Sequence, residues 1–133
     1  MSWLVMDTET SIQSLAKRKA SPFHPDNYVV MMGWQAKADA KPQGSRFTND
    51  GGEAVANKFA ELLAAPGLRF VVGINVKFDI LHIIKHPIAL SAWQKFVAAG
   101  GLVFDPQLAE YLMEGQDQQS HMLSMDELAL RYD

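Results

Sequence analysis

The sequence predicts an α/β fold in which helices flank a mixed five-stranded sheet. Two observations predict it: three strand-like apolar segments separated by turn signals come first, and the later strand-like segments alternate with segments of helical periodicity. The expected order is β-β-β-α-β-α-α-β-α-α. A meander followed by βαβ crossovers gives a mixed sheet, and functional groups in such sheets gather at strand ends.

Five segments have the composition of strands. Apolar or β-rich runs predict strands over residues 3–6, 28–35 and 68–74, and the last is expected to be central because it shows little alternation. The turn signal Lys41-Pro42-Gln43-Gly44 precedes a short strand at 45–48 that closes a hairpin. A fifth short strand is expected at 102–104. The polar segment 11–27, with two prolines, is expected to be a long loop.

The first three helices follow from periodicity and capping signals. Apolar positions at helical spacing predict a helix over residues 53–65, which Pro66-Gly67 ends. Asn75 is expected to cap a helix that runs to about residue 85. Pro87 then interrupts the pattern, so the next helix is expected over 91–99.

Two more helices are expected near the end of the chain. Asp105-Pro106 is a helix start with Pro at the first helical position, and that helix should run to about residue 114. A polar loop is expected over 115–122. The capping box from Ser124 to Glu127 opens a last helix that reaches the end of the sequence.

Composition limits the class of protein. The 133 residues, 48% of them hydrophobic, suit a single domain over 1–133. There are no cysteines, no segment resembles a signal peptide and no apolar run has membrane length, so a cytoplasmic location in a bacterial or phage-infected cell is expected. The net charge of −3 argues against a protein that coats nucleic acid.

Charge is distributed unevenly along the chain. Residues 1–99 hold 11 Lys and Arg against 8 Asp and Glu, whereas residues 100–133 hold 1 against 7. Basic side chains around an acidic site would be compatible with a phosphate substrate. An ordinary mixed surface explains most of the lysines equally well.

Asp7 and Glu9 are the first candidate site residues. They follow the apolar run that ends at Met6, and side chains two apart on a strand point to the same face. Two carboxylates on one face repel unless a cation binds, and oxygen ligands suit magnesium or manganese. A solvated strand end is the alternative interpretation of this short motif.

Asp79 is the second acidic signal. It falls in the first turn of the helix that Asn75 opens, where the helix dipole alone would favour a carboxylate. The functional interpretation is that Asp79 meets Asp7 and Glu9 across neighbouring strand ends. Three converging carboxylates require metal ions to neutralise them, and two ions would activate a water and stabilise the leaving oxygen in phosphodiester hydrolysis.

Four motifs together carry a family resemblance. They are the segments Asp7-Thr8-Glu9-Thr10, Asn75-x-Lys77-Phe78-Asp79, residues 105–112 and residues 123–129. The loop Pro22-Phe23-His24-Pro25-Asp26-Asn27 adds to the same resemblance. In order and spacing the set resembles the proofreading 3′–5′ exonuclease domain of family A DNA polymerases, in its phage versions, within the DEDD superfamily. The resemblance covers essentially the whole chain and implies a ribonuclease-H-like fold.

The resemblance implies a site and its cofactors. Asp7, Glu9 and Asp79 match catalytic metal ligands for two Mg²⁺ or Mn²⁺ ions. The substrate-binding positions that it implies are Thr8, Thr10, Asn75, Lys77 and Phe78. Pro106 stands where the family usually has Thr, and motif III, which supplies a fourth carboxylate and a Tyr or His, has no match up to Tyr132-Asp133. The resemblance therefore implies a domain incomplete at its C-terminal end, with three of four acidic ligands.

Three functions follow as hypotheses. The first is a metal-dependent 3′–5′ exodeoxyribonuclease that acts on the 3′ end of single-stranded DNA, with a polymerase domain in the same or a companion chain and no membrane association. The second is a catalytically incomplete module of a truncated or split polymerase that binds DNA or a partner. The third is an RNase of the same superfamily, which would have to tolerate the 2′-hydroxyl.

Other residues favour structural roles. His82 and His86 have the i, i+4 spacing of a zinc site, but no third ligand is evident. Lys17-Arg18-Lys19 could contact phosphates or be a solvated loop. Trp34 and Trp93 are expected in the core, and Asp105 is expected to cap its helix rather than bind metal.

Overall fold

The architecture was obtained as a computed structural model that describes residues 2–12, 20–36, 41–115 and 121–132. Strands and helices follow one another in the order predicted from the sequence. The strands are β1 (Ser2–Thr10), β2 (Val29–Gln35), β3 (Gln43–Arg46), β4 (Leu68–Val72) and β5 (Leu102–Phe104). The helices are α1 (Glu53–Leu63), α2 (Val76–Ile83), α3 (Pro87–Ala98), α4 (Pro106–Met113) and α5 (Met125–Tyr132).

The strands form one mixed sheet in the order β3-β2-β1-β4-β5. β1 pairs antiparallel with β2 and parallel with β4, and β4 pairs parallel with β5. The prediction of a mixed five-stranded sheet is confirmed. β4 is an interior strand, as its weak alternation indicated, but the middle strand of the sheet is β1.

Several strand boundaries differ from the predictions. β1 does not end at Met6, because β2 pairs with it as far as Thr10. β3 begins at Gln43, inside the predicted turn, where Gln43 pairs with Trp34. β4 ends at Val72, before the turn that leads into α2.

The predicted start of α3 is wrong. Proline was expected to interrupt the helix, but α3 begins at Pro87 itself, with His86 as its N-cap. The missing N–H of a proline costs nothing in the first turn, where backbone donors have no helical partner. The other helices end within two or three residues of the predicted positions.

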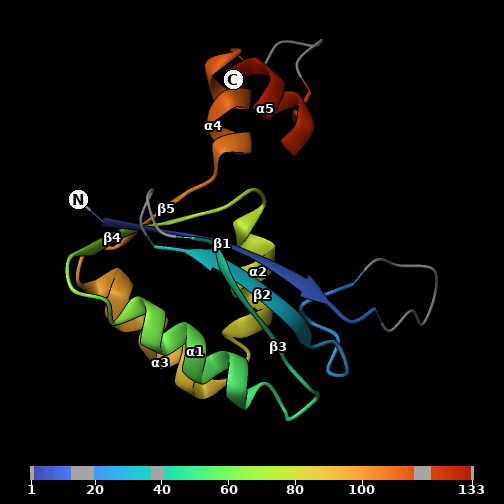
Figure 1. Cartoon of the computed structure of the whole chain (residues 1–133), viewed down its shortest axis with the longest axis vertical. Helices are drawn as coiled ribbons and strands as arrows, with labels where there is room; N and C mark the ends of the chain where they lie inside the picture. The colour runs from blue at the N-terminus through green and yellow to red at the C-terminus, as the bar shows by residue number, and fades with distance from the viewer. Residues whose placement is uncertain (1, 13–19, 37–40, 116–120, 133) are drawn as a thin grey trace.

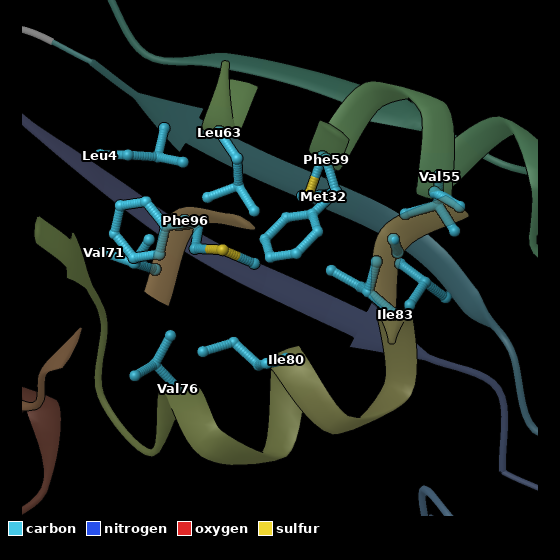
Figure 2. Packing of buried hydrophobic residues seen from close by; sticks show 14 residues of the cluster. Leu4, Met32, Val55, Phe59, Leu63, Val71, Val76, Ile80, Ile83 and Phe96 are labelled. Carbon is cyan, nitrogen blue, oxygen red and sulfur yellow. The ribbon is translucent and has the colours of Figure 1, made fainter. Parts of the chain in front are cut away.

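The hydrophobic core lies between one face of the sheet and helices α1, α2 and α3. Leu4, Met32 and Val71 from three neighbouring strands are at most 1% exposed, and Phe59 of α1 is fully buried among them. Figure 2 shows side chains of α1 and of α2 pointing toward the same strands. The core therefore fixes α2, and with it Asp79, against β1.

The opposite face of the sheet, here called the outer sheet face, is not covered by these helices (Figure 1). Cross-strand partners place Val5 beside Val72, and Val72 beside Phe104, on this face. Val5 is 38% exposed and Phe104 is 47% exposed. An apolar surface thus extends across β1, β4 and β5.

Helices α4 and α5 form a pair that extends beyond β5 (Figure 1). The carboxylate of Glu110 on α4 accepts hydrogen bonds from Arg131 and from the Tyr132 hydroxyl on α5. The predicted capping box is present, because the Ser124 N–H donates to Glu127 Oε2 at 2.7 Å and the Glu127 N–H donates to Ser124 Oγ at 3.3 Å. The α4–α5 pair is held by polar contacts of its own.

Among the residues that the structure describes, no helix has the length and apolar character needed to cross a membrane.

Candidate functional site

The far end of β1 presents Asp7 and Glu9 on the outer sheet face. Burial alternates along the strand, so Leu4, Met6 and Thr8 are buried while Asp7 and Glu9 are exposed. A register shift follows Glu9, before Thr10. The sequence prediction that the two carboxylates share one face is confirmed, although they lie within the strand rather than after it.

Asp79 reaches β1 from the opposite side of the sheet. It is 3% exposed, and its Oδ1 accepts hydrogen bonds from the Thr8 backbone N–H at 3.1 Å and from the Thr8 hydroxyl at 2.5 Å. β4 pairs with β1 only along Ser2–Val5. Asp79 therefore accepts its hydrogen bonds from a part of β1 that has no partner in β4. Thr8 therefore joins the two acidic motifs.

Burial raises the pKa of Asp79 to about 6. Desolvation is the main cause, the two hydrogen bonds from Thr8 oppose it, and the negative charge of Asp7 raises the pKa further. The favourable helix dipole expected from the sequence is thus outweighed by burial. A carboxyl group held out of water beside a second carboxylate is a common feature of functional sites.

The turn between β4 and α2 comes close to β1. A Cβ built on Gly73 would lie 2.6 Å from the Met6 carbonyl oxygen, so only glycine fits there. Asn75 occupies the N-cap position of α2, but its side chain makes no capping hydrogen bond, and the predicted side-chain cap is wrong. The reason is its left-handed backbone, with φ 52°, whereas a capping side chain needs an extended backbone.

The remaining predicted substrate-binding residues lie at the start of α2 and on β1. Asn75 and Lys77 are exposed, and Phe78 is half-buried with its ring 4.4 Å from that of His82. Thr10 is half-buried at the end of β1, and the Thr8 N–H is already engaged by Asp79. Asn75 and Lys77 are thus the two of these side chains most open to a ligand.

The site carries oxygen donors of the kind that Mg²⁺ and Mn²⁺ prefer. Asp7 and Glu9 are exposed, and both Thr8 bonds go to Oδ1 of Asp79, so Oδ2 takes no part in them. Within the described ranges, however, no three His, Cys, Asp or Glu side chains lie close enough together to hold a metal ion. The donor chemistry fits a divalent cation, and the assembled ligand set stays a prediction.

The two histidines have structural contacts, as the sequence analysis favoured. His82 is buried, with its Nδ1 3.0 Å from the Phe78 carbonyl oxygen, and His86 Nδ1 accepts from the Ile88 N–H at 3.3 Å as the cap of α3. Since a carbonyl oxygen can only accept, the proton of His82 lies on Nδ1. Neither contact resembles a zinc site.

The structure also confirms the structural roles predicted for Trp34, Trp93 and Asp105. Trp34 and Trp93 pack against the core. Asp105 caps α4, since its Oδ1 accepts from the Gln107 N–H at 2.9 Å. Lys17-Arg18-Lys19 lies outside the described residues.

Two contacts at the site were missed in the sequence. Alternation along β1 would have placed the Thr8 side chain on the buried face, opposite to Asp7 and Glu9, but nothing local names Asp79 as its partner. Asp105 makes a second contact besides its cap, because its Oδ2 accepts from the Asn75 N–H at 2.9 Å. No sequence signal connects residues 30 positions apart in this way.

No family model matches this chain. No curated protein matches it either. Among solved structures, it is similar to the family B DNA polymerase from the hyperthermophilic archaeon Pyrobaculum calidifontis, at 19% sequence identity and a TM-score of 0.50. The match covers 68% of this chain and 11% of that polymerase chain.

The architecture is compatible with a ribonuclease-H-like fold. At this identity the likeness to the polymerase is one of fold alone, and this chain corresponds to a small part of the larger protein's length. The similar structure is a family B polymerase, whereas the sequence motifs resemble family A. The resemblance to family A and to phage enzymes rests on the sequence motifs alone.

Proposed function

We propose that this chain is a metal-dependent 3′–5′ exonuclease domain associated with a DNA polymerase. The observation that carries the proposal is the junction at Thr8, which holds buried Asp79 against the strand that exposes Asp7 and Glu9. The fold shared with part of a DNA polymerase supports the polymerase context. The resemblance of the motifs supports the proofreading type, in its family A phage form.

Each site residue has a task in this proposal. Asp7, Glu9 and Asp79 would hold two Mg²⁺ or Mn²⁺ ions, which supply an activated water and neutralise charge on the phosphate. The exposed Asn75 amide and the Lys77 ammonium would bind the terminal nucleotide and its phosphate at the start of α2. Phe78 offers part of its ring to the terminal base.

Arg46 adds a basic group to the same face. Glu9 pairs with Met31, and Met31 pairs with Arg46, so exposed Arg46 lies two strands from Glu9 on the outer sheet face. An arginine there would contact the DNA backbone upstream of the terminal nucleotide.

The test is hydrolysis of a single-stranded DNA oligonucleotide labelled at its 5′ end, with Mg²⁺ or Mn²⁺ present. A ladder that shortens from the 3′ end is expected, and Asp7→Asn should slow it by about a hundredfold or more. Glu61→Gln is the matched control, since Glu61 is an exposed acid on α1 that pairs with Lys58. Cleavage by the Asp7 variant at the rate of the control would rule out the assignment.

A second candidate is a module that binds DNA without cutting it. It is favoured by the absence, within the described residues, of a three-residue metal-holding group. This function predicts binding of single-stranded DNA that weakens as salt rises, without turnover at any metal concentration. Metal-dependent cleavage by the chain alone would exclude it.

A further inference from the structure

Asp105 uses its two carboxylate oxygens for two different helices. Oδ1 accepts from the backbone N–H groups of Gln107 at 2.9 Å and Leu108 at 3.2 Å in the first turn of α4. Oδ2 accepts from the N–H of Asn75 at 2.9 Å, at the start of α2. One half-buried carboxylate therefore links the starts of α4 and α2.

The segment that Asp105 holds is conformationally demanding. Asn75 is the one non-glycine residue with positive φ in the described part of the chain, a backbone state that costs about 1–2 kcal/mol for most residues and less for asparagine. A second bond supports the same junction, from the Gly73 N–H to the Phe104 carbonyl oxygen at 3.2 Å. External partners on the β5–α4 segment thus stabilise the turn.

We propose that Asp105 is a positioning residue for the DNA-binding site. It fixes the backbone of Asn75, and through it the direction of the Asn75 amide and the first turn of α2 that carries Asp79. This inference rests on the proposed function. It also makes the α4–α5 pair part of the site's support, although neither helix supplies a group to the site.

The variant Asp105→Asn separates the two roles of the carboxylate. Asparagine caps a helix about as well as aspartate, so its oxygen can replace Oδ1. Its amide nitrogen then stands where Oδ2 stood and meets the Asn75 N–H, donor against donor. The cap is kept and the link to Asn75 is lost.

Asp50→Asn is the matched control. Asp50 also uses both oxygens near a helix start, since Oδ1 accepts from the Gly52 N–H at 2.9 Å and Oδ2 accepts from the Ala54 N–H at 3.0 Å. It serves α1 and makes no contact with Asn75 in the described structure. Asp50→Asn should affect stability in the same manner as Asp105→Asn, without changing the site.

The experiment compares wild type and both variants as full chains. Affinity for a 5′-fluorescein single-stranded DNA oligonucleotide is measured by anisotropy in EDTA, together with hydrogen exchange of the Asn75 amide. Asp105→Asn should weaken DNA binding about tenfold and speed exchange at Asn75, while Asp50→Asn does neither. Asp105→Ser, which can cap but cannot reach Asn75, should behave like Asp105→Asn and serves if that variant does not fold.

Two different failures can be told apart. If wild type binds DNA and the Asp105 variants bind equally well, the positioning role is wrong while the proposed function stands. If wild type neither binds DNA in EDTA nor shortens it when Mg²⁺ is present, the proposed function fails, and the positioning role fails with it.

Discussion

At the scale of single residues, Asp79 is the most unusual group in the structure. A carboxyl group that is 3% exposed and close to Asp7 would be more stable if it were neutral or paired with a cation. Thr8 provides two hydrogen bonds but no positive charge. The native fold therefore retains a residue at this position that opposes its own stability at neutral pH.

The buried carboxylate of Asp79 should lower the stability of the folded protein at neutral pH. The folded pKa of about 6 lies above the ordinary value of 3.8, so folding favours the protonated form of Asp79. The penalty is absent below pH 3.8, grows as the pH rises to about 6, and is complete above it. Asp79→Asn keeps the acceptor for Thr8 and removes the charge, so its melting temperature at pH 7 should exceed that of wild type by roughly 4 °C.

Calorimetric melting curves of both proteins between pH 4 and pH 8 measure the effect. The gap between the two melting temperatures should widen from pH 4 to pH 6 and then stay constant. A gap that does not depend on pH would show that Asp79 titrates normally. Glu53→Gln, which changes an exposed acid at the start of α1, is the control.

The residues of the site were partly predictable from the sequence. Two-residue periodicity was enough to place Asp7 and Glu9 on one face, because that geometry is local. The partner of Asp79 was not predictable, since Thr8 lies 71 positions away. The second role of Asp105 was hidden because a helix cap fully explains an aspartate before a proline.

At the scale of elements, the β4–α2 turn determines where the candidate site is built. It brings Gly73 close to the backbone of β1 and gives Asn75 its left-handed conformation. The first turn of α2 then delivers Asp79 to Thr8. The position of α2 relative to β1 thus depends on Gly73, which has no side chain.

Gly73→Ala is therefore expected to be damaging. The new Cβ would lie 2.6 Å from the Met6 carbonyl oxygen and 3.1 Å from Val76 Cβ, and the backbone atom cannot move without disturbing β1. A loss of roughly 1–3 kcal/mol in the free energy of unfolding is expected, measured by urea denaturation. Gly44→Ala should cost much less, because its Cβ would be 3.5 Å from the nearest atom, the Met32 carbonyl oxygen.

The attachment of α5 supplies another prediction. An eight-residue helix is not stable alone, and the contacts of Arg131 and Tyr132 with Glu110 hold α5 to α4. Hydrogen bonds from Tyr132 and Arg131 hold the pKa of Glu110 below its ordinary 4.5. Their contribution is complete above pH 4.5 and is lost as the pH falls below that value.

Glu110→Gln should therefore detach α5 at pH 7. Amide hydrogen exchange in Met125–Tyr132 should become faster, while exchange in the core strands stays unchanged. Glu114→Gln is the graded comparison, since Glu114 accepts a single bond from Arg131 at 2.6 Å and should have a smaller effect. Equal protection of α5 in wild type and Glu110→Gln would contradict the prediction.

Element order was predictable from the sequence, and boundaries were less so. Proline removes a backbone donor, which predicts a break at Pro87, but at a first helical position that donor has no partner to lose. The length of β1 depends on pairing with β2, which a local apolar pattern cannot show. Tertiary pairing therefore decided the boundaries that were missed.

At the scale of the whole molecule, the sheet has one covered and one open face. Helices α1, α2 and α3 cover the inner face of the sheet (Figure 1), while apolar side chains of β1, β4 and β5 remain on the outer sheet face. Contiguous apolar surface is a feature of contact sites on proteins. The apolar surface lies next to the acidic end of β1, so the outer sheet face has an apolar part and an acidic part.

The open face should bind an apolar fluorescent dye such as anilinonaphthalene sulfonate in the native state. Leu102→Lys places a charge on β5, where Leu102 is 50% exposed, and should lower the dye fluorescence by roughly a third or more. Leu130→Lys is the control, because Leu130 is 82% exposed on α5 and lies off the sheet. Equal dye fluorescence in both variants would place the dye elsewhere.

The contact between Thr8 and Asp79 has a consequence for how the protein is made. The two residues are 71 positions apart, and the parallel pairing of β1 with β4 closes a loop of similar length. Long-range closures of this kind are slow and come late in folding. A chain emerging from the ribosome has Asp7 and Glu9 from the start, but Asp79 reaches Thr8 only after α2 has been synthesised and docked.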